Sequence, residues 1–159
     1  MKNTTLCYIH DGQGRTLLLH RIKKNQDLNH DKWVGVGGKF EENESPEECL
    51  IREVLEETGL TLTDYRYRGI VTFVSAVWES ELMHLFTAHG FEGTVKECDE
   101  GALEWIDDEV VPTLPTWEGD RIFLELLEQD IPFFSLKLEY DAEETLISAV
   151  LNGQPLRWK

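Results

Sequence analysis

Residues 45–59 constrain the fold of this chain more than any other segment. Ser45-Pro46-Glu47-Glu48 combines a capping box with proline at the first helical position, and Gly59 supplies a left-handed stop. These signals predict a helix over residues 46–58. An apolar arc of roughly 140° on its helical wheel, which we expect to face the core, holds Leu50, Ile51, Val54 and Leu55.

A neighbouring arc of about 100° on the same helix carries Glu53, Glu56 and Glu57. Like charges at these spacings repel, and the helix dipole disfavours the two in the last turn, so a cation should compensate them. Arg52 lies at helical spacing from Glu48 and Glu56 and could partly neutralise the cluster. Carboxylate clusters suit hard divalent cations, so the pattern indicates a Mg²⁺-phosphate site. The helix alone leaves a solvated acidic surface as the alternative.

The segments around this helix predict a sheet and a second helix. Residues 119–129 have helical apolar spacing, and residues 33–38 combine a short strand with a glycine-rich loop. At 159 residues, with no internal repeat or linker, the chain is expected to form one domain over residues 1–159. The expected strands are 4–9, 16–20, 67–77, 82–89, 103–106 and, as the last one, 133–140.

The loop and helix together read Gly38-x5-Glu44-x7-Arg52-Glu53-Val54-x-Glu56-Glu57-x-Gly59-Leu60. This segment resembles the Nudix hydrolase signature at every specified position. The resemblance implies an α/β fold, the Nudix α/β/α sandwich with a central mixed β-sheet. It also implies that the segment holds divalent cations at a nucleoside diphosphate linked to another moiety.

Carried over position by position, the resemblance makes Glu56 and Glu57 the main metal ligands. Glu53 becomes a further ligand or the group that activates water, and the Gly37 carbonyl joins the metal shell. The implied cofactor is Mg²⁺, with Mn²⁺ as a substitute. Metal ions that bridge phosphate oxygens and acidify water fit an attack of water on phosphorus.

Other residues of the segment have supporting roles under the same resemblance. Arg52 orients Glu53 in catalysis, while Gly38, Glu44 and Gly59 support the loop and the helix end. Family members often use one more acidic residue from outside the segment. Glu100 is the candidate here, as a catalytic residue and metal ligand, and an exposed acidic loop is its alternative interpretation.

Further segments extend the resemblance to the MutT-type enzymes that remove oxidised nucleotides: WVGVGGK from Trp33, residues 97–105, Trp117-Glu118-Gly119-Asp120, and the closing FFSLKLEYD. The resemblance implies that Trp117 and Asp120 hold a purine, because an indole stacks on a base and a carboxyl group pairs with its N–H edge. The alternatives are a core aromatic residue for Trp117 and a helix N-terminal acid for Asp120. Phe73 lines this pocket or belongs to the core.

Two positions depart from the mammalian relatives of this type, so base recognition should differ in detail. Val34 stands where they have asparagine, and Gly119 stands where they have a second aspartate. Neither side chain can form a hydrogen bond with a base. Backbone amides or Asp120 would then have to distinguish an oxidised guanine from an ordinary one.

The charge distribution limits the partners of the chain. A net charge of −16 argues against binding to a nucleic acid polymer. Residues 1–40 nevertheless contain seven basic and three acidic residues. Arg21 and Lys39 are the candidates from this basic region for contacts with substrate phosphates, and solubilising loop charge is the alternative.

Other features bear on the location of the protein. The N-terminus lacks an apolar signal region, and no stretch is long enough to span a membrane. The cysteines, Cys7, Cys49 and Cys98, are an odd number without the spacing of a zinc site and are expected to be reduced. We therefore expect a cytoplasmic protein that binds no membrane. Whether it is a monomer or a homodimer is open.

The leading hypothesis is a Mg²⁺-dependent hydrolase of purine nucleoside triphosphates that cleaves 8-oxo-dGTP to 8-oxo-dGMP and pyrophosphate, and so sanitises the nucleotide pool. A second hypothesis changes the substrate to ADP-ribose, a dinucleoside polyphosphate or a nucleotide sugar. A third is a Nudix-fold sensor that binds a nucleotide without hydrolysing it. Every carboxylate of the signature is present and no basic helix-turn-helix pattern follows, which favours an enzyme.

Overall fold

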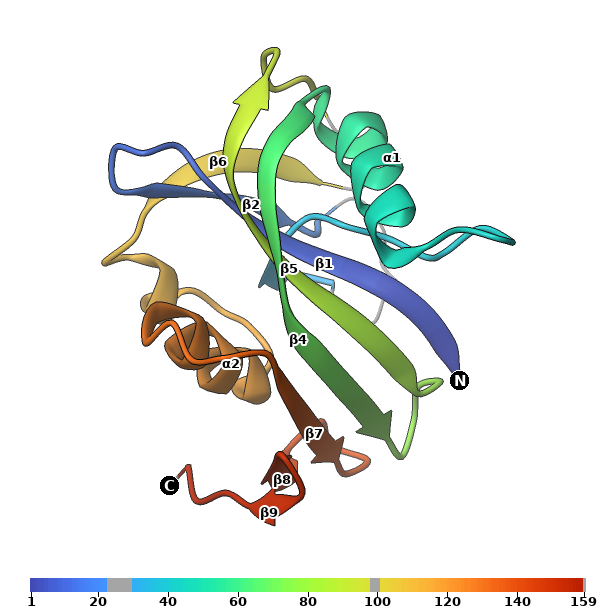
Figure 1. The fold of residues 1–159 in the computed structure, drawn as a ribbon. Helices are drawn as coiled ribbons and strands as arrows, with labels where there is room; N and C mark the ends of the chain where they lie inside the picture. Colours follow the sequence, from blue (N-terminus) through green and yellow to red (C-terminus); the bar gives the residue numbers. More distant parts are fainter. Residues whose placement is uncertain (23–29, 98–100, 159) are drawn as a thin grey trace.

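The structure, a computed structural model, describes residues 1–22, 30–97 and 101–158 (Figure 1). In this part of the chain one nine-stranded sheet lies between two α-helices. The elements are β1 (Lys2–His10), β2 (Arg15–His20), β3 (Trp33–Val34), α1 (Pro46–Thr58), β4 (Thr61–Ser75), β5 (Glu81–Glu92), β6 (Ala102–Asp107), the 3-10 helix Val111–Thr113, α2 (Glu118–Glu128), β7 (Phe134–Tyr140), β8 (Leu146–Leu151) and β9 (Gln154–Pro155).

The sheet is mixed, as predicted. Its strand order is β3-β2-β1-β5-β4-β7-β8-β9, and β6 also pairs with β2. Two of the pairings, β1 with β5 and β4 with β7, are parallel, whereas the others are antiparallel. The central strands therefore pair with segments that are distant in the sequence.

The two helices cover opposite faces of the sheet (Figure 1). Successive side chains along a strand point to opposite faces, so neighbouring residues of β1 pack toward different helices. On one face, Leu50 and Val54 of α1 belong to the same apolar cluster as Cys7. On the other face, Phe123 of α2 shares a cluster with Tyr8, the next residue of β1. The predicted α/β/α sandwich is confirmed.

The core face of α1 is narrower than its sequence suggested. Ile51 and Leu55 were expected in the core but are 36% and 48% exposed. The buried positions of this helix are instead Cys49, Leu50, Val54 and Thr58. Ile51 and Leu55 lie at one edge of the apolar arc, and their side chains are partly exposed to solvent.

The bounds of α1 agree with the prediction, but the strands extend further. The fourth strand begins at Thr61, six residues before the predicted residue 67. The prediction began too late because Asp64 and Arg66 interrupt the apolar pattern. The segment 133–140 is not the last strand, since β8 and β9 follow it. The turn between β7 and β8, residues 141–145, was missed because it contains neither glycine nor proline. It is closed by Asp141, whose Oδ1 accepts hydrogen bonds from the backbone of Glu143 and Thr145.

Candidate functional site

Both ends of α1 are fixed by local hydrogen bonds. Ser45 Oγ accepts a hydrogen bond from the Glu48 backbone at 3.1 Å, and Glu48 Oε1 accepts one from the Ser45 backbone at 2.9 Å. At the other end Gly59 has a left-handed φ of 82°, and its N–H donates to the Leu55 carbonyl. Glu48 is thus part of the cap, whereas Glu56, the other glutamate expected beside Arg52, bonds its guanidinium.

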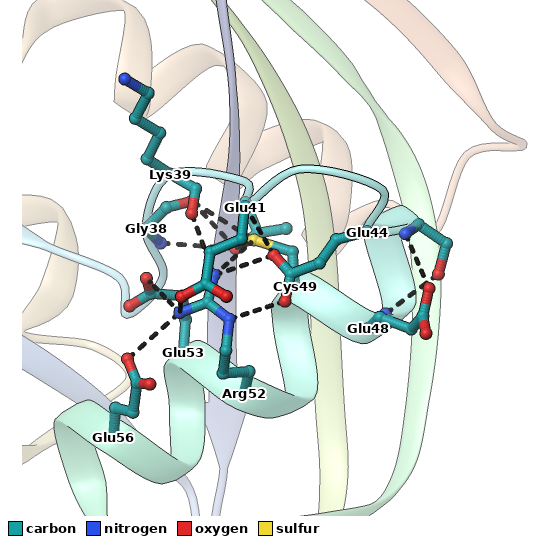
Figure 2. Close-up of polar contacts among 11 residues, drawn as sticks. Gly38, Lys39, Glu41, Glu44, Glu48, Cys49, Arg52, Glu53 and Glu56 are labelled. Carbon is teal, nitrogen blue, oxygen red and sulfur yellow. Dashed lines mark hydrogen bonds and ion pairs between the residues drawn. The ribbon is translucent and has the colours of Figure 1, made fainter.

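Arg52 lies at the centre of the polar contacts between the loop and α1 (Figure 2). Its Nε and Nη2 donate to the two carboxylate oxygens of Glu44 at 2.6 and 2.9 Å. Its Nη1 donates to Glu53 Oε1 at 2.9 Å and to Glu56 Oε2 at 3.1 Å. One guanidinium therefore connects the loop with two of the three clustered glutamates.

These contacts change the acidity of the groups involved. The hydrogen bond from Arg52 lowers the pKa of Glu44 to about 2, and hydrogen bonding to Glu44 raises the pKa of Arg52 further above its usual range. Both groups remain charged at any pH where an enzyme operates. The loop and the helix are consequently held together by a permanent ion pair.

The glycines before α1 allow the loop to approach both β1 and the glutamate cluster. A Cβ atom on Gly38 would lie 2.3 Å from Glu53 Cδ, and one on Gly37 would lie 2.0 Å from the Thr5 carbonyl oxygen. The loop is held in this position by a hydrogen bond of 2.9 Å from the Thr5 backbone to the Gly38 carbonyl. The side chain of Glu53 therefore packs directly against the backbone of Gly38.

The three glutamates differ in exposure. The Glu53 side chain is 16% exposed and that of Glu56 is 58% exposed, while Oε2 of the half-buried Glu57 is inaccessible to solvent. No three His, Cys, Asp or Glu side chains among the described residues converge closely enough to hold a metal ion by themselves. The guanidinium of Arg52, which bonds both Glu53 and Glu56, separates these two carboxylates.

This set of donors still fits a hard divalent cation. Carboxylate and carbonyl oxygens are the ligands that Mg²⁺ prefers, and Mg²⁺ usually keeps several waters and takes other ligands from substrate phosphates. The close contact of Glu53 with Gly38 brings a carboxylate next to the loop that carries the Gly37 carbonyl. The site thus offers part of a coordination shell and leaves the remainder to phosphate and water.

The structure places two of the three remaining predicted residues. Glu100 lies outside the described residues. Lys39 is exposed, and its side chain points away from Arg52 while its carbonyl accepts a hydrogen bond from Arg52 Nη2 (Figure 2). The backbone of Arg21 pairs with that of Asp31 and Lys32, next to β3. No described contact tests whether Arg21 or Lys39 meets a phosphate.

A second group of predicted residues lies around the start of α2. The rings of Phe73 and Trp117 meet edge to face with centroids 5.3 Å apart, and Tyr140 approaches Trp117 at 4.8 Å. The Asp120 backbone donates to the Trp117 carbonyl at 3.0 Å, which places both at the first turn of the helix. The structure therefore brings Phe73, Trp117 and Asp120 together. All three are buried, so the interpretation as core residues fits as well.

Asp120 is unusual because it is a buried carboxyl group. Burial raises its pKa to about 7, although the hydrogen bond from Thr116 Oγ1 (2.8 Å) and the positive charges of Lys32 and Arg121 oppose this shift. Near neutral pH the protonated and ionised forms are thus similarly populated. The same group can then donate or accept a hydrogen bond.

The packing explains both departures from the related sequences. A Cβ atom on Gly119 would lie 2.5 Å from Leu138 Cδ1 and 2.5 Å from Tyr140 Oη, and the Gly119 N–H donates to that hydroxyl at 2.7 Å. An aspartate has no room there. Val34 packs against Leu19 and Leu103, in a separate apolar cluster. Its position is a core position in this chain.

Several residues in this region were not predicted from the sequence. Lys32 Nζ lies 4.6 Å above the centroid of the Trp117 ring and 3.2 Å from Glu144 Oε1, although the three residues are far apart in the chain. The contact follows from the bond between the Trp33 N–H and the Pro115 carbonyl, which no pattern in the sequence indicates. Four of the five tryptophans pack in or against the apolar cluster on this face: Trp33, Trp78, Trp117 and Trp158.

Comparisons with known proteins agree with the fold and the loop–helix segment. The sequence model of the NUDIX domain matches residues 2–127. The oxidized purine nucleoside triphosphate hydrolase of Danio rerio is 36% identical over 118 residues, covering 73% of this chain and 73% of that protein. The Mus musculus protein of the same name is 31% identical over 127 residues, covering 79% and 80%.

A solved structure extends this similarity to nearly the whole chain. The crystal structure of the mutator MutT protein from Bacillus halodurans matches with a TM-score of 0.83 at 29% identity, over 98% of this chain and 100% of its own. In the described part of the chain, neither helix is long and apolar enough to cross a membrane.

Proposed function

The chain belongs to the Nudix domain family, and from this premise we propose that it hydrolyses oxidised purine nucleoside triphosphates with Mg²⁺. The reaction converts 8-oxo-dGTP to 8-oxo-dGMP and pyrophosphate and serves the cytoplasmic nucleotide pool. Membership of the family makes the chain a Nudix hydrolase that acts on small nucleotides. The observation that carries the finer proposal is the buried pair of Trp117 and Asp120 on the α2 side of the sheet.

In the proposed site, Glu56 and Glu57 with the Gly37 carbonyl hold Mg²⁺, for which Mn²⁺ can substitute, and Glu100 is a further ligand. When bound, the ion supplies neutralisation of phosphate charge and lowers the pKa of a coordinated water. Glu53 is a ligand or accepts the proton of the attacking water. Arg52 fixes the position of Glu53 by its hydrogen bond of 2.9 Å to Oε1, so the carboxylate does not have to reorient during the reaction.

The base is bound on the opposite side of the sheet from α1. Phe73 and Trp117 form apolar walls for a flat purine, and Asp120 pairs with its N–H edge. Lys32 lies over the Trp117 ring, so the proposed base site includes this lysine. Arg21 and Lys39 contact the phosphates from the basic region before α1. The names of the Danio rerio and Mus musculus relatives support this choice of substrate.

The test is a panel of 8-oxo-dGTP, dGTP, ATP and ADP-ribose with Mg²⁺ and identification of the products. We expect 8-oxo-dGTP to be the best substrate and to yield pyrophosphate and the monophosphate. If the protein instead cleaves ADP-ribose into two phosphorylated fragments with a higher kcat/KM than it has for any triphosphate, the proposed substrate is wrong and ADP-ribose takes its place. Nucleotide binding that survives Glu56→Gln and Glu57→Gln, without turnover in the parent protein, would instead favour a sensor.

A further inference from the structure

The side chain of Lys32 contacts two separate segments of the chain, one at Trp117 and one at Glu144. Its ammonium lies 4.6 Å above the Trp117 ring and 3.2 Å from Glu144 Oε1. The next residue, Trp33, donates its backbone N–H to the Pro115 carbonyl at 2.8 Å, two residues before Trp117. The position of Lys32 relative to Trp117 is therefore set by the backbone as well as by the side chain.

The ion pair with Glu144 fixes the ammonium without using all of its protons. Glu144 divides its oxygens between Lys32 and Trp78, whose indole N–H donates to Oε2 at 3.1 Å. An ammonium group has three protons and no acceptor. Within the described part of the chain, the contact with Glu144 engages one of them, so Lys32 retains donors for a ligand.

The charge of Lys32 also acts on Asp120. The charge of Lys32 lowers the pKa of Asp120 against the larger effect of burial. The pocket thus combines a group that can only donate with a carboxyl group that can donate or accept. Val34 packs elsewhere and Gly119 has no side chain, so neither contributes a polar group to a bound base.

Purine bases present one of two hydrogen-bonding patterns at positions 6 and 1, and the pair of Lys32 and Asp120 can distinguish them. In guanine and hypoxanthine the carbonyl O6 is an acceptor beside the N1–H donor, whereas adenine has an N6 amino donor at the same position. A group that only donates attracts the first pattern and leaves the amino group of the second unpaired. Sites that hydrogen-bond a specific group discriminate strongly against analogues that cannot pair with it.

We propose that Lys32 is a specificity-determining residue that donates to the six-carbonyl oxygen of the purine and selects 6-oxo over 6-amino purine nucleotides. The inference rests on the proposed function, since it places the base beside Trp117 and Asp120. It adds a residue for which the related sequences gave no role and replaces the contact that Val34 and Gly119 cannot make.

Calorimetric titration with dGMP, dIMP and dAMP tests the proposal without requiring turnover. The parent protein should bind dGMP and dIMP at least about tenfold more tightly than dAMP, the scale of a charged hydrogen bond. Lys32→Met should weaken the two 6-oxo nucleotides by about tenfold and leave dAMP unchanged, whereas Lys32→Arg should retain the preference. Lys137→Met, which removes an exposed lysine on β7, is the matched control and should bind like the parent.

Each other outcome has a distinct meaning. An equal loss for all three monophosphates in Lys32→Met would assign Lys32 to phosphate binding or to structure and overturn the proposal, as would unchanged binding or a parent protein without a 6-oxo preference. The melting temperature of each variant and the retained affinity for dAMP show that the fold is intact. If the parent binds dGMP selectively but hydrolyses no triphosphate, the proposed function fails and the role of Lys32 in base selection stands.

Discussion

Replacing Asp120 with asparagine removes the titration of a buried carboxyl group in the first turn of α2, and the effect of this titration on stability can be worked out from its pKa. The pKa of Asp120 is about 7 in the folded protein, against 3.8 for an ordinary aspartate. The folded state therefore binds more protons than the unfolded state between these two values, and the free energy of unfolding falls as the pH rises. At about 1.4 kcal/mol for each pKa unit, the full effect is about 4 kcal/mol.

Between pH 5 and pH 8.5 the same linkage gives a change of about 3 kcal/mol, because part of the effect lies below pH 5. The amide of Asp120→Asn can still accept the hydrogen bond from Thr116 and does not ionise. We therefore expect the free energy of unfolding of the parent, minus that of the variant, to fall by about 3 kcal/mol over this range. Other titrating groups are common to both proteins and cancel in the difference.

The assay is urea unfolding of both proteins at several pH values, followed by tryptophan fluorescence. Asp64→Asn, at an exposed aspartate on β4, controls for the loss of a surface charge and should show a flat difference. Parallel pH profiles for the parent and Asp120→Asn would refute the reasoning. So would a difference that rises with pH, because it would mean that folding lowers the pKa of Asp120.

Three further predictions concern α1 and its loop. Gly38→Ala should lower kcat at least about tenfold in a Mg²⁺-dependent assay, because its Cβ would displace the Glu53 carboxylate 2.3 Å away; unchanged kcat would show that the contact of Glu53 with the loop is not needed. Ser45→Ala should reduce the free energy of urea unfolding by about 1 kcal/mol through loss of the N-cap, and equal stability would contradict the role of the capping box. Chelation with EDTA should abolish hydrolysis, Mg²⁺ or Mn²⁺ should restore it, and activity that survives chelation would count against the metal site.

Features that depend on contacts between residues close in the sequence could be predicted, whereas those that depend on long-range contacts could not. The bounds of α1 were predicted correctly because Ser45, Glu48 and Gly59 form contacts within one turn of their own chain. The same local reasoning gave the contact of Arg52 with Glu56 but not its principal partner. In the folded protein it makes a bidentate ion pair with Glu44, eight residues away in the loop, and only the path of the loop decides between these partners.

Around the proposed base site, the pKa of Asp120 and the contact of Lys32 with Trp117 could not be predicted, because both depend on long-range packing. The residues Phe73, Trp117 and Asp120 were selected through resemblance, but the raised pKa of Asp120 follows from burial, which needs the whole fold. The contact of Lys32 with Trp117 depends on the pairing of β3 with β2 and on the hydrogen bond from the Trp33 backbone to the Pro115 carbonyl before α2. Periodicity along the chain carries no information on either point.

The parallel pairing of β1 with β5 has a consequence for the order in which the protein folds. Thr5 pairs with His84 across these strands and also binds the Gly38 carbonyl in the loop before α1. The strand that holds the loop is therefore itself held by a strand that is made later during synthesis. Because such distant pairings form slowly, the hydrolytic centre should mature late, and a nascent chain that has not yet reached β5 should be inert.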